Sequence, residues 1–164
     1  RRGVKPYAEL LGWGQASDGH NVAISHPEGL GLVRAIENAF RRAGITASEV
    51  DYVNAHATST LIGDASEGKA LDTIFSSKCL SPKISSTKAI TGHGLSLASA
   101  LETVLVSIAI KEGFTPGSAH IENLDPKFEA LNVIRTTEMV GPNVVLSNSS
   151  GFGGANVVLI LKKP

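Results

Sequence analysis

The stretch DYVNAHATST, residues 51–60, joins a short apolar run to one histidine and three small hydroxyl residues. Residues 51–55 have the length and apolar content of a short buried β-strand. His56 therefore stands where this strand ends, and parallel sheets bind ligands at the carboxyl ends of their strands. Two interpretations are open: His56 ends a strand above ordinary turn residues, or it is a catalytic imidazole with a substrate lying along the hydroxyls.

Helices and strands alternate around this stretch. Apolar residues spaced by three and four predict helices over residues 29–42, 63–75 and 94–111. Short apolar or alternating runs predict strands over residues 4–11, 51–55, 83–85, 132–135, 143–147 and 155–162. Strands that alternate with helices indicate parallel pairing, whereas the successive strands at the end indicate antiparallel pairing. The sequence therefore predicts one α/β domain with a mixed sheet.

Two local features refine this arrangement. The helix over residues 94–111 has a broad apolar face expected to pack into the core, made of Leu97, Leu101, Val104, Leu105 and Ile108. The loop NSSGFGG, residues 148–154, is too long and too rich in glycine for a simple tight hairpin between the last two strands.

Composition excludes several classes of function. Lys plus Arg and Asp plus Glu each number 15, so the chain lacks the positive surplus of a nucleic-acid-binding protein. No apolar run reaches the ~18 residues of a membrane span, so no membrane partner is expected. A single cysteine, Cys79, cannot build internal disulfides and indicates a reducing compartment, the cytoplasm. Cys79 lies in a polar connecting stretch and is interpreted as an incidental loop thiol.

Polar groups concentrate in three segments, each placed where a predicted strand ends. The segments are NAHATST (54–60), followed by Glu67; SSTKAITGHG (85–94); and SNSSGFGGAN (147–156). Because ligand sites gather at the carboxyl ends of parallel strands, we expect the three segments to converge on one cleft.

His56 and His93 are the strongest catalytic candidates in these segments. An imidazole titrates near neutral pH and can donate or accept a hydrogen bond. Two imidazoles aimed at one point polarise a carbonyl group and stabilise the negative charge that develops on it. A zinc site is not indicated, because the chain has no second cysteine and no HxxH or HExxH spacing.

Two further features could assist such chemistry. Lys88 lies five positions before His93, and a charge interaction with Glu67 would let it orient that imidazole. Residues 151–154, GFGG, permit positive φ, and backbone N–H groups in such a turn can point at an oxyanion. Phe152 is a large residue among glycines, which suggests a movable gate over an apolar channel.

Taken in order, these strings resemble the carboxyl-terminal half of the β-ketoacyl-acyl carrier protein synthases. The resemblance is carried by VNAHATSTLIGDASE (53–67), SSTKAITGHG (85–94), SNSSGFGGAN (147–156), RRGVKPYAELLGWGQASDG (1–19) and HIENLDP (120–126), and it covers essentially the whole chain. It implies a thiolase-like fold of two similar halves, each a five-stranded mixed β-sheet packed with α-helices, with residues 1–164 forming the second half.

The resemblance also implies a reaction, decarboxylative Claisen condensation in fatty acid or polyketide biosynthesis. Malonyl-carrier protein loses carbon dioxide, and its carbanion attacks an acyl group held as a thioester on a cysteine. By position, His56 and His93 would hold the malonyl thioester carbonyl and stabilise the enolate. Lys88 would organise His93, and Glu67 would pair with Lys88.

Further residues take roles from the same resemblance. The Phe152 N–H would form part of an oxyanion hole, with Gly151 and Gly153 beside it in the gate. Thr58 and Thr60 would hydrogen-bond the phosphopantetheine arm, which would explain the hydroxyls behind His56. Four residues match positions around a structural monovalent cation in some relatives: Asn54, Glu102, Ser147 and Asn148. That cation would give Glu102, a carboxylate among apolar residues, the partner that burial demands.

The implied partners are acyl carrier protein, an amino-terminal half of the same enzyme, and a second subunit in a homodimer or heterodimer. No cofactor is required, because the substrate is carried on the phosphopantetheine of the carrier protein. The nucleophilic cysteine belongs to the amino-terminal half, and Cys79 does not match it. A chain-length-factor-like, non-catalytic partner subunit is the alternative, although such partners usually lose part of the set His56, His93 and Lys88. A thiolase would need a second cysteine as base, and none accompanies GHG or GFGG.

Overall fold

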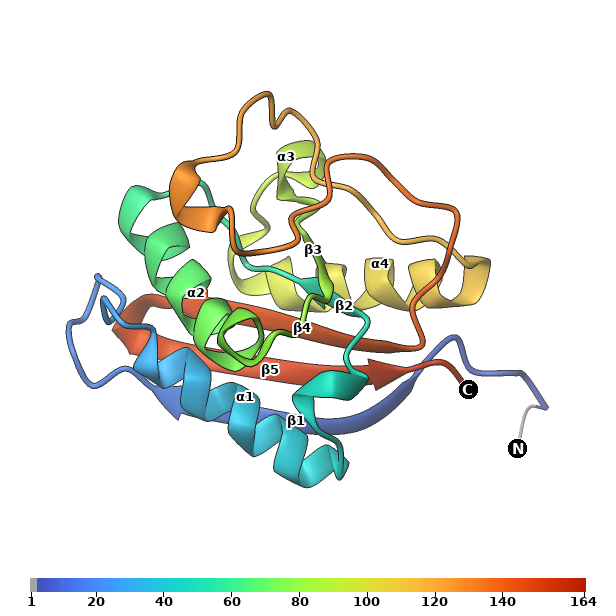
Figure 1. The fold of residues 1–164 in the computed structure, drawn as a ribbon. Coiled ribbons are helices and arrows are strands. Elements are labelled where there is room, and N and C mark those ends of the chain that lie inside the picture. Colours follow the sequence, from blue (N-terminus) through green and yellow to red (C-terminus); the bar gives the residue numbers. More distant parts are fainter. Residues whose placement is uncertain (1–2) are drawn as a thin grey trace.

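The computed structural model describes residues 3–164, which form one five-stranded sheet with helices on both faces (Figure 1). The strands are β1 (Glu9–Ser17), β2 (Tyr52–Asn54), β3 (Lys83–Ser85), β4 (Val144–Gly151) and β5 (Ala155–Lys162). Their order across the sheet is β1-β5-β4-β2-β3. Strand β2 runs parallel to β3 and β4, whereas β5 runs antiparallel to β1 and β4. The predicted mixed α/β sheet, parallel early and antiparallel late, is confirmed.

Four α-helices connect or cover these strands within residues 3–164. They are α1 (Leu30–Ala43), α2 (Leu61–Ile74), the single turn α3 (Lys88–Thr91) and α4 (Ala98–Glu112). Short 3₁₀ turns lie at Ala47–Glu49, Ser76–Lys78, Leu95–Leu97, Pro126–Phe128 and Phe152–Gly154. None of the helices in this part of the chain is long and apolar enough to cross a membrane.

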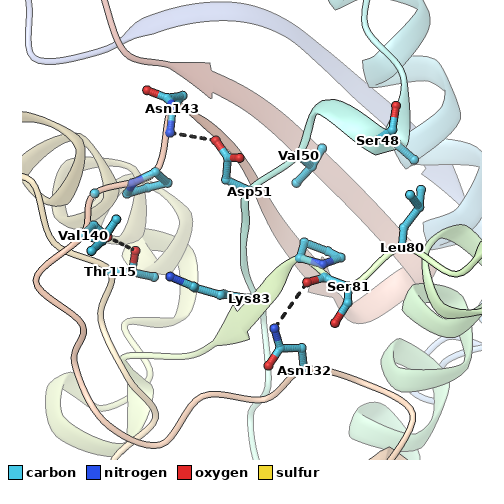
Figure 2. Close-up of a pocket in the computed structure, with 14 residues that line it drawn as sticks. Ser48, Val50, Asp51, Leu80, Ser81, Lys83, Thr115, Asn132, Val140 and Asn143 are labelled. Atoms are coloured by element: carbon cyan, nitrogen blue, oxygen red, sulfur yellow. Dashed lines mark hydrogen bonds between the residues drawn. The ribbon is translucent and has the colours of Figure 1, made fainter.

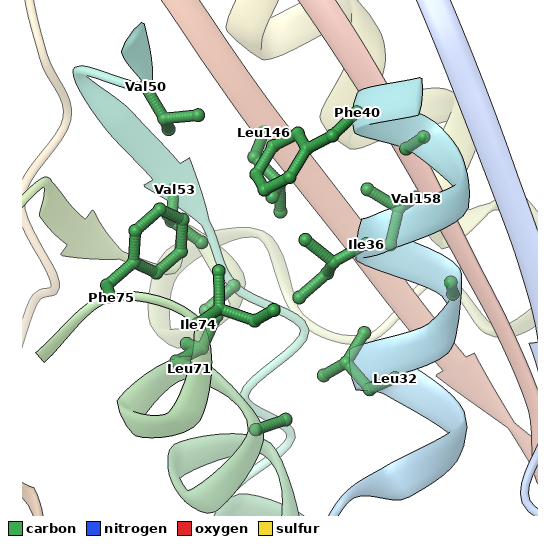
Figure 3. Close-up of a cluster of buried hydrophobic side chains, with 14 of the residues drawn as sticks. Leu32, Ile36, Phe40, Val50, Val53, Leu71, Ile74, Phe75, Leu146 and Val158 are labelled. Atoms are coloured by element: carbon green, nitrogen blue, oxygen red, sulfur yellow. The ribbon is translucent and has the colours of Figure 1, made fainter. Parts of the chain in front are cut away.

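Helices α1 and α2 cover one face of the sheet and form the larger core with it (Figure 3). Apolar side chains from both helices meet those of the central strands: Leu32, Ile36, Phe40, Leu71, Ile74, Val53, Leu146, Val158 and Ile160. Helix α1 approaches β1 closely because Gly14 has no side chain; a Cβ there would lie 1.9 Å from the Ala35 carbonyl oxygen. This packing fixes α1 and α2 beside the strand ends that carry the site.

Helix α4 covers the other face, but with a different side from the one that the sequence predicts. Its buried residues are Ala98, Glu102, Val106, Ala109 and Ile110. The predicted core face is wrong, because Leu97, Val104 and Ile108 of that face are exposed. A helix that is apolar on both sides has no unique core face in its sequence, and such a helix is typically buried all round.

Several predicted boundaries also differ from the structure. The first strand runs over Glu9–Ser17 rather than the predicted residues 4–11. Its extent is set by pairing with the antiparallel strand β5, from Lys162 to Ala155, and not by the partial alternation of apolar residues in its sequence. Residues 132–135 form no strand; Val133 makes an isolated bridge to Ile84 at the edge of β3. Strands β4 and β5 do form a hairpin, closed by Phe152–Gly154, because β4 continues to Gly151.

Two helix starts differ for local reasons. Helix α4 begins at Ala98, because Leu95–Leu97 forms a separate 3₁₀ turn in which Leu95 has a positive φ of 51°. Helix α2 begins at Leu61, two residues earlier than predicted.

Candidate active site

The three polar segments leave the sheet at one edge. In the parallel register, Asn54 of β2 pairs with Ser85 of β3 on one side and Ser147 of β4 on the other. The residues that follow these positions therefore emerge together, as expected for the carboxyl ends of parallel strands. The predicted convergence of the three segments follows directly from this register.

The imidazoles of His56 and His93 face each other across this edge. Their ring centroids are 5.5 Å apart and their planes are inclined by 85°. His56 is half-buried at the end of β2, and His93 is exposed in the described chain, beyond α3. Rings this close can donate hydrogen bonds to one small polar group placed between them.

Glu67 fixes the backbone that carries His56. From α2, its carboxylate accepts hydrogen bonds from the N–H of His56 at 2.7 Å and of Ala57 at 2.8 Å. The Asn148 side chain donates a third, also at 2.7 Å. Burial raises the pKa of Glu67, and these three donors oppose the rise. The carboxylate thus joins α2, β4 and the end of β2 at one point.

The predicted ion pair between Lys88 and Glu67 is not formed. The Lys88 ammonium instead pairs with the carboxylate of Glu102 on α4, with both side chains buried. Glu67 is saturated by N–H donors, so Glu102 is the carboxylate left for a buried cation. Burial raises the pKa of Glu102, and the Lys88 ammonium opposes that rise. Glu102 thereby gains a protein partner that the sequence did not identify.

The environment keeps the His56 ring neutral. Burial lowers its pKa from 6.5 to about 4, and the nearby Lys88 ammonium and His93 ring act in the same direction. Its Nδ1 atom is buried and has no hydrogen-bond partner within residues 3–164. At neutral pH the ring is therefore an uncharged group with hydrogen-bonding capacity to spare.

The hydroxyls behind His56 lie on a constrained turn. Ala57 and Ser59 have positive φ angles of 32° and 64°, which cost non-glycine residues about 1–3 kcal/mol each. The Thr58 and Thr60 hydroxyl oxygens are 3.4 Å apart. Thr60 is the residue before α2 but makes no side-chain capping bond. Both hydroxyls are therefore placed side by side and are free of a helix-capping role.

The GFGG turn is tied to the loop that follows β1. The N–H of Gly153, a residue with φ of 77°, donates to the Val22 carbonyl at 2.7 Å. This bond occupies the Gly153 N–H, so it positions the turn rather than pointing at a substrate. The Phe152 side chain is 86% exposed, with nothing of the described chain packed over it.

Of the four residues proposed to surround a cation, Asn54, Ser147 and Asn148 lie at the strand ends, whereas Glu102 lies on α4. The Asn54 side chain donates to the Ser147 hydroxyl at 3.1 Å. Asn148 Oδ1 and Glu102 Oε2 are buried oxygens without a hydrogen-bond partner among residues 3–164. Amide, hydroxyl and carboxylate oxygens suit a hard cation, but the Asn148 side chain contacts Glu67 of α2 while Glu102 lies on α4 at the other face of the sheet, so the four side chains do not converge on one point. No cluster of three or more His, Cys, Asp or Glu side chains able to hold a metal occurs in the same residues.

Comparison with known proteins identifies the family of this chain. The family described as β-ketoacyl synthase, C-terminal domain, matches residues 7–122. The chain belongs to that family. This family match and the structural neighbours described below confirm the expected fold, a thiolase-like ketosynthase half.

This ketoacyl synthase domain is similar to much longer proteins. A mitochondrial 3-oxoacyl-[acyl-carrier-protein] synthase of Arabidopsis thaliana is 42% identical over 98% of this chain, but the match covers 35% of its own length. A chain of the ishigamide ketosynthase/chain length factor has a TM-score of 0.91 at 32% identity, covering 99% of this chain and 40% of that one. The structure of a type II polyketide acyl-carrier protein in complex with its ketosynthase has a TM-score of 0.94 at 28% identity, and the match again covers 99% of this chain and 40% of that one. The chain spans well under half the length of these relatives.

Two residues of the ketoacyl synthase domain that shape the site lie outside the predicted set. Asn156, at the start of β5, accepts from the Ser150 hydroxyl at 2.7 Å and donates to Asp18 at 2.9 Å. Asp18 also accepts the His26 N–H at 3.1 Å. Asn156 belongs to the segment SNSSGFGGAN, and a polar residue within a predicted strand was the only sequence feature that could have marked it as part of the site. Asp18 in a polar loop gave none.

A second hollow of about 430 Å³ lies at the opposite end of β2 and β3 (Figure 2). Its polar groups bond to one another: Asp51 accepts the Asn143 N–H at 2.8 Å, and the Asn132 amide donates to the Ser81 carbonyl at 3.3 Å. These polar groups of the described chain are therefore already paired with one another, and the histidine edge remains the candidate site.

Proposed function

We propose that the protein containing this domain is a 3-oxoacyl-acyl carrier protein synthase. It condenses malonyl-acyl carrier protein with an acyl thioester held on a cysteine, releasing carbon dioxide, in fatty acid or polyketide biosynthesis. The single observation that best supports the proposal is the facing pair His56 and His93, 5.5 Å apart at the carboxyl edge of the sheet. The names of the relatives support the same reaction class.

In this reaction the malonyl thioester oxygen accepts hydrogen bonds from His56 and His93. The bond to the carboxylate carbon breaks, carbon dioxide leaves, and the electron pair remains as an enolate. The enolate carbon then bonds to the acyl carbonyl carbon, and the cysteine leaves as a thiolate. Donors aimed at a developing oxyanion lower the barrier, and losing one typically costs ~10²–10³-fold in rate.

The neutral state of His56 suits this role. A ring with a pKa lowered to about 4 donates a hydrogen bond at pH 7 without carrying a full charge. An imidazolium would readily hand its proton to the enolate carbon and quench the nucleophile. The Lys88 ammonium helps to lower the pKa of His56, while Glu102 holds that ammonium in place as its buried partner. Lys88 and Glu67 are therefore positioning residues rather than groups that touch substrate.

The substrate would arrive on a flexible arm. Thr58 and Thr60 present adjacent hydroxyls, and the phosphopantetheine arm is mostly neutral amide, so hydroxyl partners suit it better than charges. The Phe152 N–H would bind the oxyanion of the acyl-cysteine, and its exposed ring, with Gly151 and Gly153 beside it, would act as a gate. Acyl carrier protein is the proposed donor, as a related ketosynthase has been captured with its own carrier.

An amino-terminal half would complete the site and supply the nucleophilic cysteine. One uncovered apolar surface supports it, the outer side of α4 with Val104 and Ile108. A related ketosynthase is seen with a chain length factor, which supports a dimer, homodimeric or heterodimeric, for the whole protein. We place the reaction in the cytoplasm on the strength of the single, unpaired Cys79.

A monovalent cation would occupy a structural role beside the site. Of the residues Asn54, Glu102, Ser147 and Asn148, the side chains of Asn54, Ser147 and Glu102 would hold it from the α4 side of the sheet, where Glu102 Oε2 is buried without a partner in the described chain, and Asn148 would contribute through its backbone. Its charge would compensate that oxygen and stiffen the ends of β2 and β4. It would take no part in bond making.

The decisive experiment uses His56→Ala in the whole protein. Carbon dioxide release from malonyl-acyl carrier protein should fall by ~10²–10³-fold, while transfer of an acyl group to the cysteine persists. His120→Ala, which removes an exposed loop histidine, is the matched control and should retain full activity. Unchanged carbon dioxide release in His56→Ala would contradict the proposal. Failure of the unmodified protein to accept an acyl group at all would favour the chain-length-factor-like partner subunit.

A further inference from the structure

A cavity of about 360 Å³ lies directly behind the strand end that carries His56. Ala55 and Ala57 line it, whereas the His56 ring between them does not. Helix α2 forms one wall, residues 118–133 form the other, and Ile84–Ser86 of the β3 end closes the base. Neither histidine ring lines the cavity, but it shares residues 55–57 with the histidine cleft and is also lined by Thr60, a proposed pantetheine contact.

The walls of this cavity are mainly apolar. The apolar lining side chains come from α2, β3 and the 118–133 segment: Leu71, Ile84, Ile121, Leu124, Phe128, Leu131 and Val133. Phe128 lies against the backbone of α2, because a Cβ on Gly68 would be only 2.5 Å from its ring. A volume of this size with apolar walls suits the body of a small organic molecule.

The charges that line the cavity are unbalanced. Three carboxylates, Asp64, Glu67 and Asp125, face one ammonium, Lys127. Glu67 is saturated by its three N–H donors, and Asp125 accepts the Lys127 N–H within its own turn at 3.0 Å. Asp64, which receives hydrogen bonds from the backbone of residues 58–60, and Asp125, which has a second oxygen, are the carboxylates of the lining that could accept a further donor. The lining therefore disfavours an anion and favours a cation.

Asp64 itself is incompletely satisfied. It is half-buried in the first turn of α2, and its Oδ1 atom is buried without a hydrogen-bond partner within residues 3–164. Burial raises the pKa of Asp64, although the nearby backbone of residues 58–60 and the Lys88 ammonium oppose the rise. Because Oδ1 is closed off, a positive group in the cavity would have to approach the other carboxylate oxygen, Oδ2.

We propose that this cavity binds a small amphipathic primary amine, with its apolar body against Leu71, Phe128 and Leu131 and its ammonium at Asp64. The proposal goes beyond the condensation, whose malonyl and pantetheine groups carry no cation. Occupancy would act on the active site through residues 55–57 and Glu67, which border both the cavity and His56. The cavity is thus a candidate control point for the position of the His56 ring.

The test measures binding of three molecules of nearly one shape to the whole polypeptide. The probes are 2-phenylethylamine, the neutral 2-phenylethanol and the anionic 3-phenylpropanoate, titrated calorimetrically at pH 7. The amine should bind at least tenfold more tightly than the alcohol, and the anion should bind least. Equal affinities for amine and alcohol, or no binding of any probe, would overturn the proposal. These titrations involve no condensation, so their failure leaves the proposed reaction untouched.

Two variants and one control locate the probe. Asp64→Asn should remove the tenfold preference for the amine, while Ile121→Trp should fill the cavity and weaken both amine and alcohol at least tenfold. Asp72→Asn removes a carboxylate from a more exposed part of α2, outside the cavity, and should change neither affinity. A preference that survives Asp64→Asn would refute the assignment of the ammonium site. The NMR signals of the His56 ring should shift on saturation with amine, and a static ring would refute the link to the active site.

Discussion

Protonation of His56 should destabilise the folded protein at acidic pH. Burial, with Lys88 and His93 nearby, lowers the pKa of His56 from 6.5 to about 4. Between these two values the unfolded chain binds a proton at His56 that the folded chain does not. The free energy of unfolding contributed by this group is therefore intact above about pH 6.5 and is lost as the pH falls towards 4.

The size of this effect follows from the pKa difference. A difference of about 2.5 corresponds to about 3.4 kcal/mol when the folded state feels the full shift. The His56 ring is half-buried rather than fully buried, so solvent screens part of the interaction. We expect His56 to contribute about 2 kcal/mol to the loss of stability between pH 7.5 and pH 4.5.

The assay compares urea unfolding of the unmodified protein with that of His56→Gln at both pH values. Other titrating groups contribute almost equally to the two proteins, so the difference between them isolates His56. Relative to the unmodified protein, His56→Gln should be about 2 kcal/mol more stable at pH 4.5 than it is at pH 7.5. His120→Gln, at an exposed loop position, should show the same pH dependence as the unmodified protein. Parallel curves for the unmodified protein and His56→Gln would refute the reasoning.

Other substitutions test the supports around the two rings. Glu67→Gln should lower the free energy of unfolding in urea by about 2 kcal/mol, because the new amide NH₂ must face a backbone or Asn148 donor. Asp72→Asn, also on α2, is the control. Equal stabilities of Glu67→Gln and the unmodified protein would contradict the three-donor arrangement. Lys88→Met should cost about 3–5 kcal/mol by leaving the Glu102 carboxylate buried alone. Adding Glu102→Leu to Lys88→Met should recover more than half of that loss, and a double variant no more stable than the single one would show that the two side chains are not partners. Phe152→Ala should leave stability within about 0.5 kcal/mol, since the ring is exposed, but should alter the chain length of the products; an unaltered product distribution would remove the gating role.

Much of the fold follows from local pattern. Helix α1 was predicted almost to the residue, because Leu32, Ile36 and Phe40 mark a single apolar face and Gly44 ends it. Strands β3 and β5 were predicted with their observed bounds. The meeting of His56 and His93 was also predictable, since each follows a strand whose parallel neighbours share one edge.

The errors arise where pattern gives no unique answer. Helix α4 carries apolar residues on both sides, so the sequence could not say that Val106 and Ile110, rather than Val104 and Ile108, face the sheet. The 132–135 run pairs with β3 only through the bridge between Val133 and Ile84. Residues that pair across the fold, such as Asn148 with Glu67, lie 81 positions apart and leave no local signal.

The two buried carboxylates show why the misassigned ion pair matters. Glu67 holds the His56 backbone through N–H donors, and Glu102 neutralises Lys88 through a side-chain pair. Had Glu67 carried both tasks, one substitution would have changed the position and the electrostatic surroundings of His56 together. Because the tasks fall on different residues, Glu67→Gln should act on the His56 pKa through the position and burial of the ring, whereas Lys88→Met should act on it by removing a nearby positive charge. Two different carboxylates therefore govern the backbone position of His56 and the charge near its ring.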